Sequence, residues 1–155
     1  MATTQNQQHH GAARRILFAD DHQETRRVMS LLLTHAGFIV DAAENGHQAL
    51  HLFREAPEEY DVLITDHEMP ELDGLGLVEK LREARFHGKI IVVSGGLSFG
   101  NAEAYTALQV DEILSKPVRR RALIEAIQDP HSQSDGEGMT PEQRGAPDGA
   151  LAQLE

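Results

Sequence analysis

Several residue types are missing or scarce in this sequence, and each absence excludes a class of protein. There is no cysteine, which excludes disulfide bonds, thiolate metal sites and a cysteine nucleophile. No apolar run approaches the ~18–20 residues of a membrane-spanning helix, and none at the N-terminus suggests a signal peptide. Only 14 basic residues stand against 25 acidic ones, and the net charge of −11 repels nucleic acids and anionic membranes. We therefore expect a soluble, cytoplasmic protein that binds neither nucleic acid nor membrane.

The composition divides the 155 residues into one central domain and two arms. Residues 1–13 carry no charged side chain and are too polar to bury the surface that would offset their ordering entropy. Residues 130–155 hold three prolines, four glycines and a net charge of −4, a composition typical of disorder. We expect a disordered N-terminal arm, a folded domain over residues 14–129, and a disordered acidic tail with no separate output domain.

Within the central domain, short apolar runs alternate with stretches of helical periodicity. The expected strands are Ile16–Ala19, Phe38–Val40, Val62–Thr65, Ile90–Val93 and Ile113–Leu114. Such alternation is typical of a parallel sheet with helices on both faces. Unbroken apolar runs belong in the centre of the sheet and shorter, more polar runs at its edges, which the strand order 2-1-3-4-5 satisfies. We predict an α/β fold: a flavodoxin-like, doubly wound (βα)5 domain with a five-stranded parallel sheet.

The helical stretches also predict which side chains face the core. In the first, before Gly37, these are Val28, Leu31, Leu32 and Ala36. In the third they are Gly74, Leu77, Val78 and Leu81. In the last they are Leu123 and Ile127.

Three aspartates follow strands that the predicted order makes neighbours. Asp20 and Asp21 come after the first strand and Asp66 after the third, so the carboxylates converge at the carboxyl edge of the sheet. Each alone is typical of a turn or a helix cap. Together they raise one another's proton affinity unless a cation lies among them, and oxygen ligands favour Mg²⁺ or Mn²⁺.

Two further polar residues are expected at the same edge of the sheet. Ser94 ends the fourth strand and is followed by two glycines, and Lys116 with Pro117 ends the fifth. A hydroxyl and an ammonium group can both donate hydrogen bonds to phosphoryl oxygens. The predicted fold therefore indicates a phosphoryl site beside the carboxylates.

Residues 14–129 resemble the receiver domain of two-component response regulators. The matching features are the pair Asp20 and Asp21, the segment Gly37–Leu50 with its Asn45-Gly46 turn, "DVLITDHEMPELDG" from Asp61, Ser94, and Lys116-Pro117. The resemblance implies that Asp66 is the phosphoacceptor and that Ser94 and Lys116 hold the phosphoryl oxygens. The implied Mg²⁺ ligands are Asp20 (directly or through water), Asp21, Asp66 and the backbone carbonyl of Glu68.

The resemblance also implies a mode of action. A sensor histidine kinase or a histidine phosphotransfer protein would supply the phosphoryl group, and the domain would catalyse its own phosphorylation and dephosphorylation. The signal would leave through a surface made by the fourth helix, fifth strand and fifth helix, toward a protein target. Arg119–Arg121 open that last helix and are interpreted as a solvated face.

Two further residues, Ile113 and His67, need a separate interpretation. Receivers usually carry an aromatic switch residue three positions before the lysine, where this chain has Ile113, which we interpret as ordinary strand packing. His67 adjoins Asp66, and either a passive role or control of access to that carboxylate is consistent with its position.

Two other functions remain open at the level of the sequence. A metal-dependent phosphohydrolase would use the same acidic residues, but no cap segment is visible to enclose a small substrate. A receiver-like docking module that works without phosphorylation is suggested by Ile113, although every acidic ligand is present.

Overall fold

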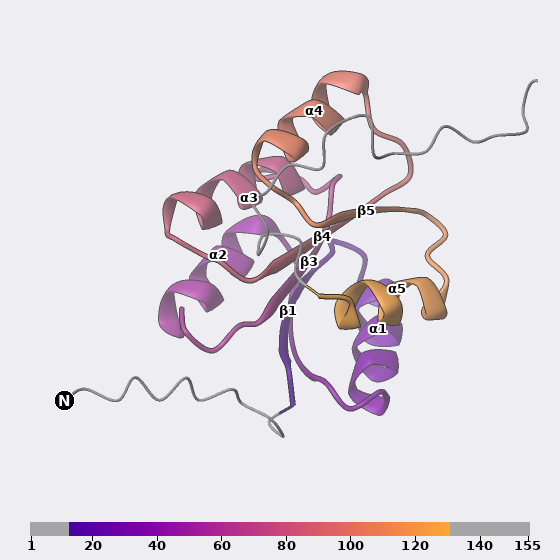
Figure 1. Cartoon of the computed structure of the whole chain (residues 1–155). Helices are drawn as coiled ribbons and strands as arrows, with labels where there is room; N and C mark the ends of the chain where they lie inside the picture. Colours follow the sequence, from indigo (N-terminus) through magenta and orange to yellow (C-terminus); the bar gives the residue numbers. More distant parts are fainter. Residues whose placement is uncertain (1–12, 131–155) are drawn as a thin grey trace, which may run out of the picture.

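The computed structural model describes residues 13–130, so the two predicted arms lie outside the described residues except for residues 13 and 130. In chain order the elements are β1 (Arg15–Ala19), α1 (Gln23–His35), β2 (Ile39–Ala43), α2 (Gly46–Glu55), β3 (Val62–Asp66), α3 (Gly74–Glu83), β4 (Lys89–Ser94), α4 (Phe99–Ala107), β5 (Glu112–Ser115) and α5 (Arg120–Gln128) (Figure 1). Within this range, none of the helices has the length and hydropathy needed to cross a membrane.

The strands form one parallel sheet in the order β2-β1-β3-β4-β5, which confirms the predicted topology. The three central strands are almost wholly buried, and the two edge strands are partly exposed. β2 begins one residue later than expected and runs on to Ala43, because its residues continue to pair with β1 as far as Ala19. Pairing with a neighbour, rather than local hydropathy, sets where an edge strand ends.

The helices cover both faces of the sheet and enclose two apolar cores. In Figure 1, α2, α3 and α4 lie on one side of the strands, and α1 and α5 lie on the other. Alternate strand residues divide between the faces, so Leu17 and Leu63 join the first core, whereas Phe18 and Ile64 join the second. The predicted core faces of α3 and α5 are confirmed, since their expected residues are buried.

The predicted core face of α1 is right for Leu32, which packs against the second core, but wrong for Val28 and Leu31. Val28 is 59% exposed and Leu31 is 72% exposed, whereas Leu33 is fully buried in the second core. Apolar residues fill most of the positions from 28 to 33, so they surround the helix rather than mark one stripe. The rotation of α1 against the sheet, which periodicity alone did not determine, selects the buried residues.

Side-chain hydrogen bonds cap the N-termini of α2, α3 and α4. Asn45, Asp73 and Ser98 each accept a hydrogen bond from the backbone N–H three residues later, at the first turns of α2, α3 and α4. The start of α3 lies directly against the end of β3. A Cβ at Gly74 would come within 2.4 Å of the backbone oxygen of Asp66, so only glycine allows this close approach.

Candidate functional site

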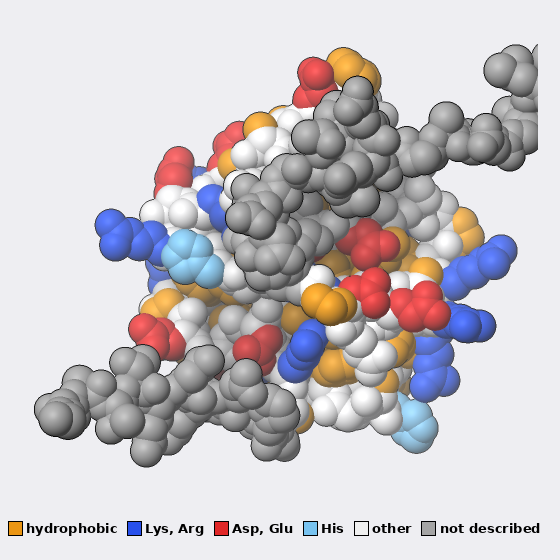
Figure 2. Space-filling view, in the orientation of Figure 1, with side chains coloured by type: hydrophobic (Ala, Val, Ile, Leu, Met, Phe, Trp, Pro, Cys, Tyr) orange, Lys and Arg blue, Asp and Glu red, His pale blue; other side chains and the backbone are white. Residues whose placement is uncertain are grey.

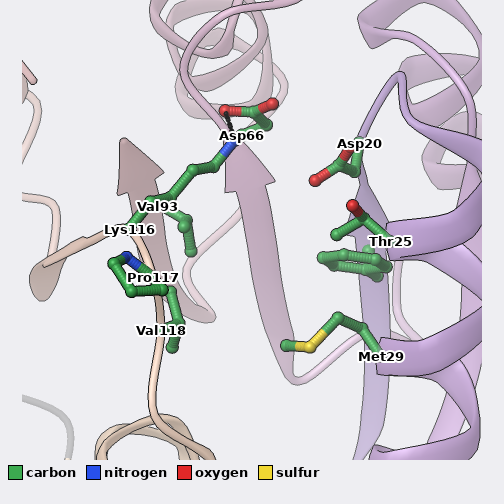
Figure 3. Close-up of a pocket in the computed structure, with 9 residues that line it drawn as sticks. Asp20, Thr25, Met29, Asp66, Val93, Lys116, Pro117 and Val118 are labelled. Carbon is green, nitrogen blue, oxygen red and sulfur yellow. Dashed lines mark ion pairs between the residues drawn. The ribbon is translucent and has the colours of Figure 1, made fainter. Parts of the chain in front are cut away.

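The acidic residues predicted to converge do meet at the carboxyl edge of the sheet. Ligand atoms of Asp20, Asp21, His22 and Asp66 all lie within 4.8 Å of one another. The parallel pairing of β1 with β3 creates this cluster by bringing together the ends of two strands far apart in sequence. In Figure 3, Asp20 projects from the β1 side toward the tip of β3, where Asp66 stands.

Asp66 is buried, and only one of its two carboxylate oxygens is paired with a positive charge. Its side chain is 1% exposed, and Lys116, from the end of β5, places its Nζ 3.0 Å from Asp66 Oδ1 (Figure 3). The backbone N–H of Glu68 donates to the same oxygen at 3.3 Å. The other oxygen, Oδ2, is buried and has no hydrogen-bond partner among residues 13–130. A buried carboxylate oxygen without a partner is costly, so this atom is suited to receive a ligand.

The pKa of the neighbouring Asp20 carboxylate is raised above its ordinary value. Burial is the largest cause that raises its pKa, and the nearby charge of Asp66 acts in the same direction. The backbone N–H of His22 donates to Asp20 Oδ1 at 2.8 Å and opposes that rise. Three carboxylates, one of them with a buried, unpartnered oxygen, fit a hard divalent cation such as Mg²⁺, which would relieve the repulsion between these groups.

The remaining predicted site residues lie at the same edge of the sheet. Ser94 is the last residue of β4 and is 3% exposed, and its Oγ accepts a hydrogen bond from the N–H of Gly96 at 3.1 Å. Its backbone oxygen accepts from the N–H of Lys116 at 2.8 Å, which joins the two residues at the ends of neighbouring strands. The exposed Glu68 lines a hollow together with Asp21.

A pocket of about 490 Å³ opens beside these residues, between the β1 and β5 sides of the site. Asp20, Asp66 and Lys116 line its polar end, and apolar side chains such as Met29 and Val118 line the rest (Figure 3). The Asp66 carboxylate therefore borders an open pocket although its own exposed area is small.

Sequence reasoning missed two histidine arrangements at the site. His22 Nδ1 lies 3.0 Å from Asp21 Oδ1, which adds an imidazole to the acidic cluster. Its position directly after the aspartate pair was a signal that could have revealed it. The ring of His67 is buried against Tyr105 of α4, which no local pattern indicates because the two residues are 38 positions apart.

Two expectations concern β5 and the start of α5. Ile113 pairs with Val92 as a residue of the edge strand β5, and its side chain is 38% exposed there. The side chains of Arg119, Arg120 and Arg121 are exposed, as expected for a solvated face. In Figure 2, basic side chains gather at the right-hand edge of the molecule, where Figure 1 places α1 and α5.

Comparison with known proteins finds the same domain repeatedly. Residues 16–128 match the family model of the response regulator receiver domain. A chemotaxis protein CheY homolog of Campylobacter jejuni is 35% identical over 127 residues, which cover 80% of this chain and 97% of the relative. Two-component system protein A of Emericella nidulans is 35% identical over 113 residues, but this chain spans only 17% of its length. A hybrid signal transduction histidine kinase I of Dictyostelium discoideum is matched over only 7% of its length.

Solved structures show the same fold over nearly their whole length. The CheY4 chemotaxis protein of Vibrio cholerae superposes with a TM-score of 0.70 at 27% identity, covering 76% of this chain and 98% of that one. A CheY-like receiver domain protein of Methanospirillum hungatei gives a TM-score of 0.71 at 28% identity, covering 75% and 91%. With its strand order, its acidic cluster and these matches, the chain belongs to the response regulator receiver domain family, whose members are phosphorylation-dependent regulators in two-component systems.

Proposed function

We propose that Asp66 accepts a phosphoryl group from a phosphohistidine on a sensor histidine kinase or a histidine phosphotransfer protein. The observation that carries this proposal is that the two oxygens of the Asp66 carboxylate have different surroundings. One oxygen is paired with Lys116, while the other is buried without a hydrogen-bond partner among the described residues. A carboxylate with one free oxygen beside a fixed cation is equipped to act as a nucleophile.

Mg²⁺ is the metal that this donor set fits best, and Mn²⁺ has similar ligand preferences. Asp20, Asp21, Asp66 and the backbone carbonyl of Glu68 are the residues that would hold it. When bound, the ion supplies positive charge that offsets the charge on the oxygens of the transferring phosphoryl group.

The residues of the chain supply position and charge for the transfer. A carboxylate oxygen of Asp66 forms a bond to phosphorus as the bond from phosphorus to the donor imidazole nitrogen breaks, and that nitrogen keeps the electron pair. Lys116, already 3.0 Å from Asp66, pairs with the phosphoryl oxygens, and Ser94 donates its hydroxyl hydrogen to them. The acyl phosphate on Asp66 is then hydrolysed by water, which resets the domain.

The signal passes to a protein partner in this proposal. Phosphorylation adds about −1.5 to −2 charge and three strong acceptors, and this draws Ser94 and Lys116 toward Asp66. Movement of Ser94 shifts the loop that leads into α4. The α4–β5–α5 face then changes its affinity for a downstream protein in the cytoplasm. A coupling of typical size, about 1–3 kcal/mol, changes that affinity about 5–150-fold.

Phosphorylation by a small-molecule donor tests the proposal. The protein is incubated with acetyl phosphate, with and without Mg²⁺, and intact mass reports one added phosphoryl group. We expect labelling that needs Mg²⁺, is abolished in Asp66→Asn and persists in Asp41→Asn. Asp41 is a suitable control because its carboxylate binds Arg15 and Tyr60 rather than the site.

Two other outcomes would identify a different function. Continuous turnover of small phosphate esters without a labelled protein would indicate a metal-dependent phosphohydrolase. A protein that binds Mg²⁺ but is never labelled, by acetyl phosphate or by the P–N donor phosphoramidate, would indicate a docking module that works without phosphorylation.

A further inference from the structure

His67, the residue after Asp66, is bonded to three different elements at once. Its backbone N–H donates to the oxygen of Val93 in β4 at 2.9 Å, and its backbone oxygen accepts from the N–H of Gly74 in α3 at 2.9 Å. Its side chain reaches α4, where Nδ1 lies 2.6 Å from the Tyr105 hydroxyl oxygen and Nε2 lies 3.2 Å from Nδ2 of Asn101. The residue beside the phosphoacceptor is therefore tied directly to α4.

Each ring nitrogen of His67 has one hydrogen-bond partner on α4. The Asn101 amide N–H donates to Nε2, so Nδ1 carries the ring proton and donates it to the Tyr105 oxygen. Both nitrogens of a buried imidazole are then satisfied, and the partners come from one helix, a turn apart. We call His67, Asn101 and Tyr105 the α4 clasp.

The side chains of the clasp are closely packed. Tyr105 is fully buried, and its ring meets the His67 ring edge to face with centroids 5.5 Å apart. A Cβ at Gly74 would lie 2.9 Å from the Tyr105 hydroxyl and 2.9 Å from the His67 Cα. Because the clasp has no spare volume, α4 cannot shift relative to His67 without stretching or breaking these hydrogen bonds.

We propose that the α4 clasp holds α4 in its resting position and is released when Asp66 is phosphorylated. The backbone bonds to Val93 and Gly74 fix His67 to β4 and α3, whereas α4 follows the loop after Ser94. Ser94 closing on the phosphoryl group therefore pulls α4 away from a stationary His67. This inference rests on the proposed function of Asp66 and adds a path from that residue to α4. The path does not need an aromatic side chain at Ile113.

The clasp implies a reciprocal effect on phosphorylation. If the clasp favours the resting state, removing its hydroxyl makes the phosphorylated state easier to reach, because coupling between two sites acts in both directions. Tyr105→Phe removes only that oxygen. Tyr60→Phe is the matched control, because Tyr60 is also buried and its hydroxyl binds Asp41 away from the site at 2.9 Å.

The test measures the rate of labelling by acetyl phosphate with Mg²⁺, by intact mass, in the full chain. We expect Tyr105→Phe to label about three- to tenfold faster than the parent, the factor for one net hydrogen bond, and Tyr60→Phe to label at the parent rate. A general loosening of the core would slow or leave unchanged the labelling of both variants. Asn101→Ala, which removes the second hydrogen bond without a core cavity, should also label faster.

A second readout follows α4 itself. The chain has no tryptophan, and Phe99 at the start of α4 is 79% exposed, so Phe99→Trp adds a single fluorescent reporter. We expect its emission to change on phosphorylation, and Tyr105→Phe to shift the unphosphorylated emission toward the phosphorylated value while Tyr60→Phe does not.

The outcomes separate the clasp from the proposed function. Labelled protein whose rate and emission are the same in Tyr105→Phe and Asn101→Ala as in the parent would overturn the clasp and leave Asp66 as the phosphoacceptor. A parent protein that is never labelled would overturn the proposed function, and the clasp with it.

Discussion

Repulsion between the clustered carboxylates should lower the free energy of unfolding of the metal-free protein. Two unit charges 4.8 Å apart repel by about 3.5 kcal/mol at an effective dielectric constant of about 20. The ammonium of Lys116, 3.0 Å from Asp66, offsets part of this repulsion. We assign about 1–2 kcal/mol of net destabilisation to the charge of Asp20, which is 3% exposed.

Replacing Asp20 by asparagine should therefore stabilise the metal-free protein. Asparagine keeps the side-chain oxygen that accepts from the N–H of His22 and removes only the charge. We expect the thermal midpoint to rise by about 4–10 °C without Mg²⁺, since 1 kcal/mol moves the midpoint of a domain of this size by a few degrees. Saturating Mg²⁺, at about one hundred times its Kd, should add about 2.7 kcal/mol to the parent and much less to Asp20→Asn.

Thermal unfolding followed by circular dichroism, with EDTA and with a series of Mg²⁺ concentrations, measures both effects. Asp41→Asn is the matched control, because it also removes one carboxylate charge but weakens the ion pair with Arg15 outside the acidic cluster. It should lower the midpoint and keep the full response to Mg²⁺. A lower midpoint for Asp20→Asn in EDTA, or an unchanged response to Mg²⁺, would refute the electrostatic reasoning.

Three further predictions concern residues of the domain outside the acidic cluster. Lys89→Met should cost about 2–4 kcal/mol in urea unfolding, because the buried ammonium donates to two backbone oxygens at the end of α5, and an unchanged midpoint would contradict this. Gly74→Ala should cost about 1–3 kcal/mol and slow labelling of Asp66, because its Cβ would lie 2.4 Å from the backbone oxygen of Asp66. Burial raises the pKa of Tyr60 to about 12 from 10.0, so its contribution to stability is present below pH 10 and is lost as the pH rises through about 12. Tyr60→Phe should lose less stability than the parent across that interval in chemical unfolding, and equal losses would exclude the effect.

Much of the fold and the centre of the site could be predicted from local patterns. Apolar runs distinguish Val62–Thr65 and Ile90–Val93 as central strands, and the burial of β3 and β4 confirms this. Parallel strands end at a common edge, so aspartates after β1 and β3 meet whatever the details of packing. The order of the strands and the acidic cluster follow from these two rules.

Other features depended on long-range packing. The sequence around Leu31 offers apolar residues on all sides of α1, and only the fit of the helix to the sheet decides that Leu33 is buried. The partners of His67 lie on α4, and sequence proximity says nothing about them. The sequence by itself determined the strand order and the carboxylate cluster, because these follow from periodicity and from the common direction of parallel strands. Only the tertiary structure decided the rotation of α1 and the α4 clasp, because each depends on how side chains distant in sequence fill the same volume.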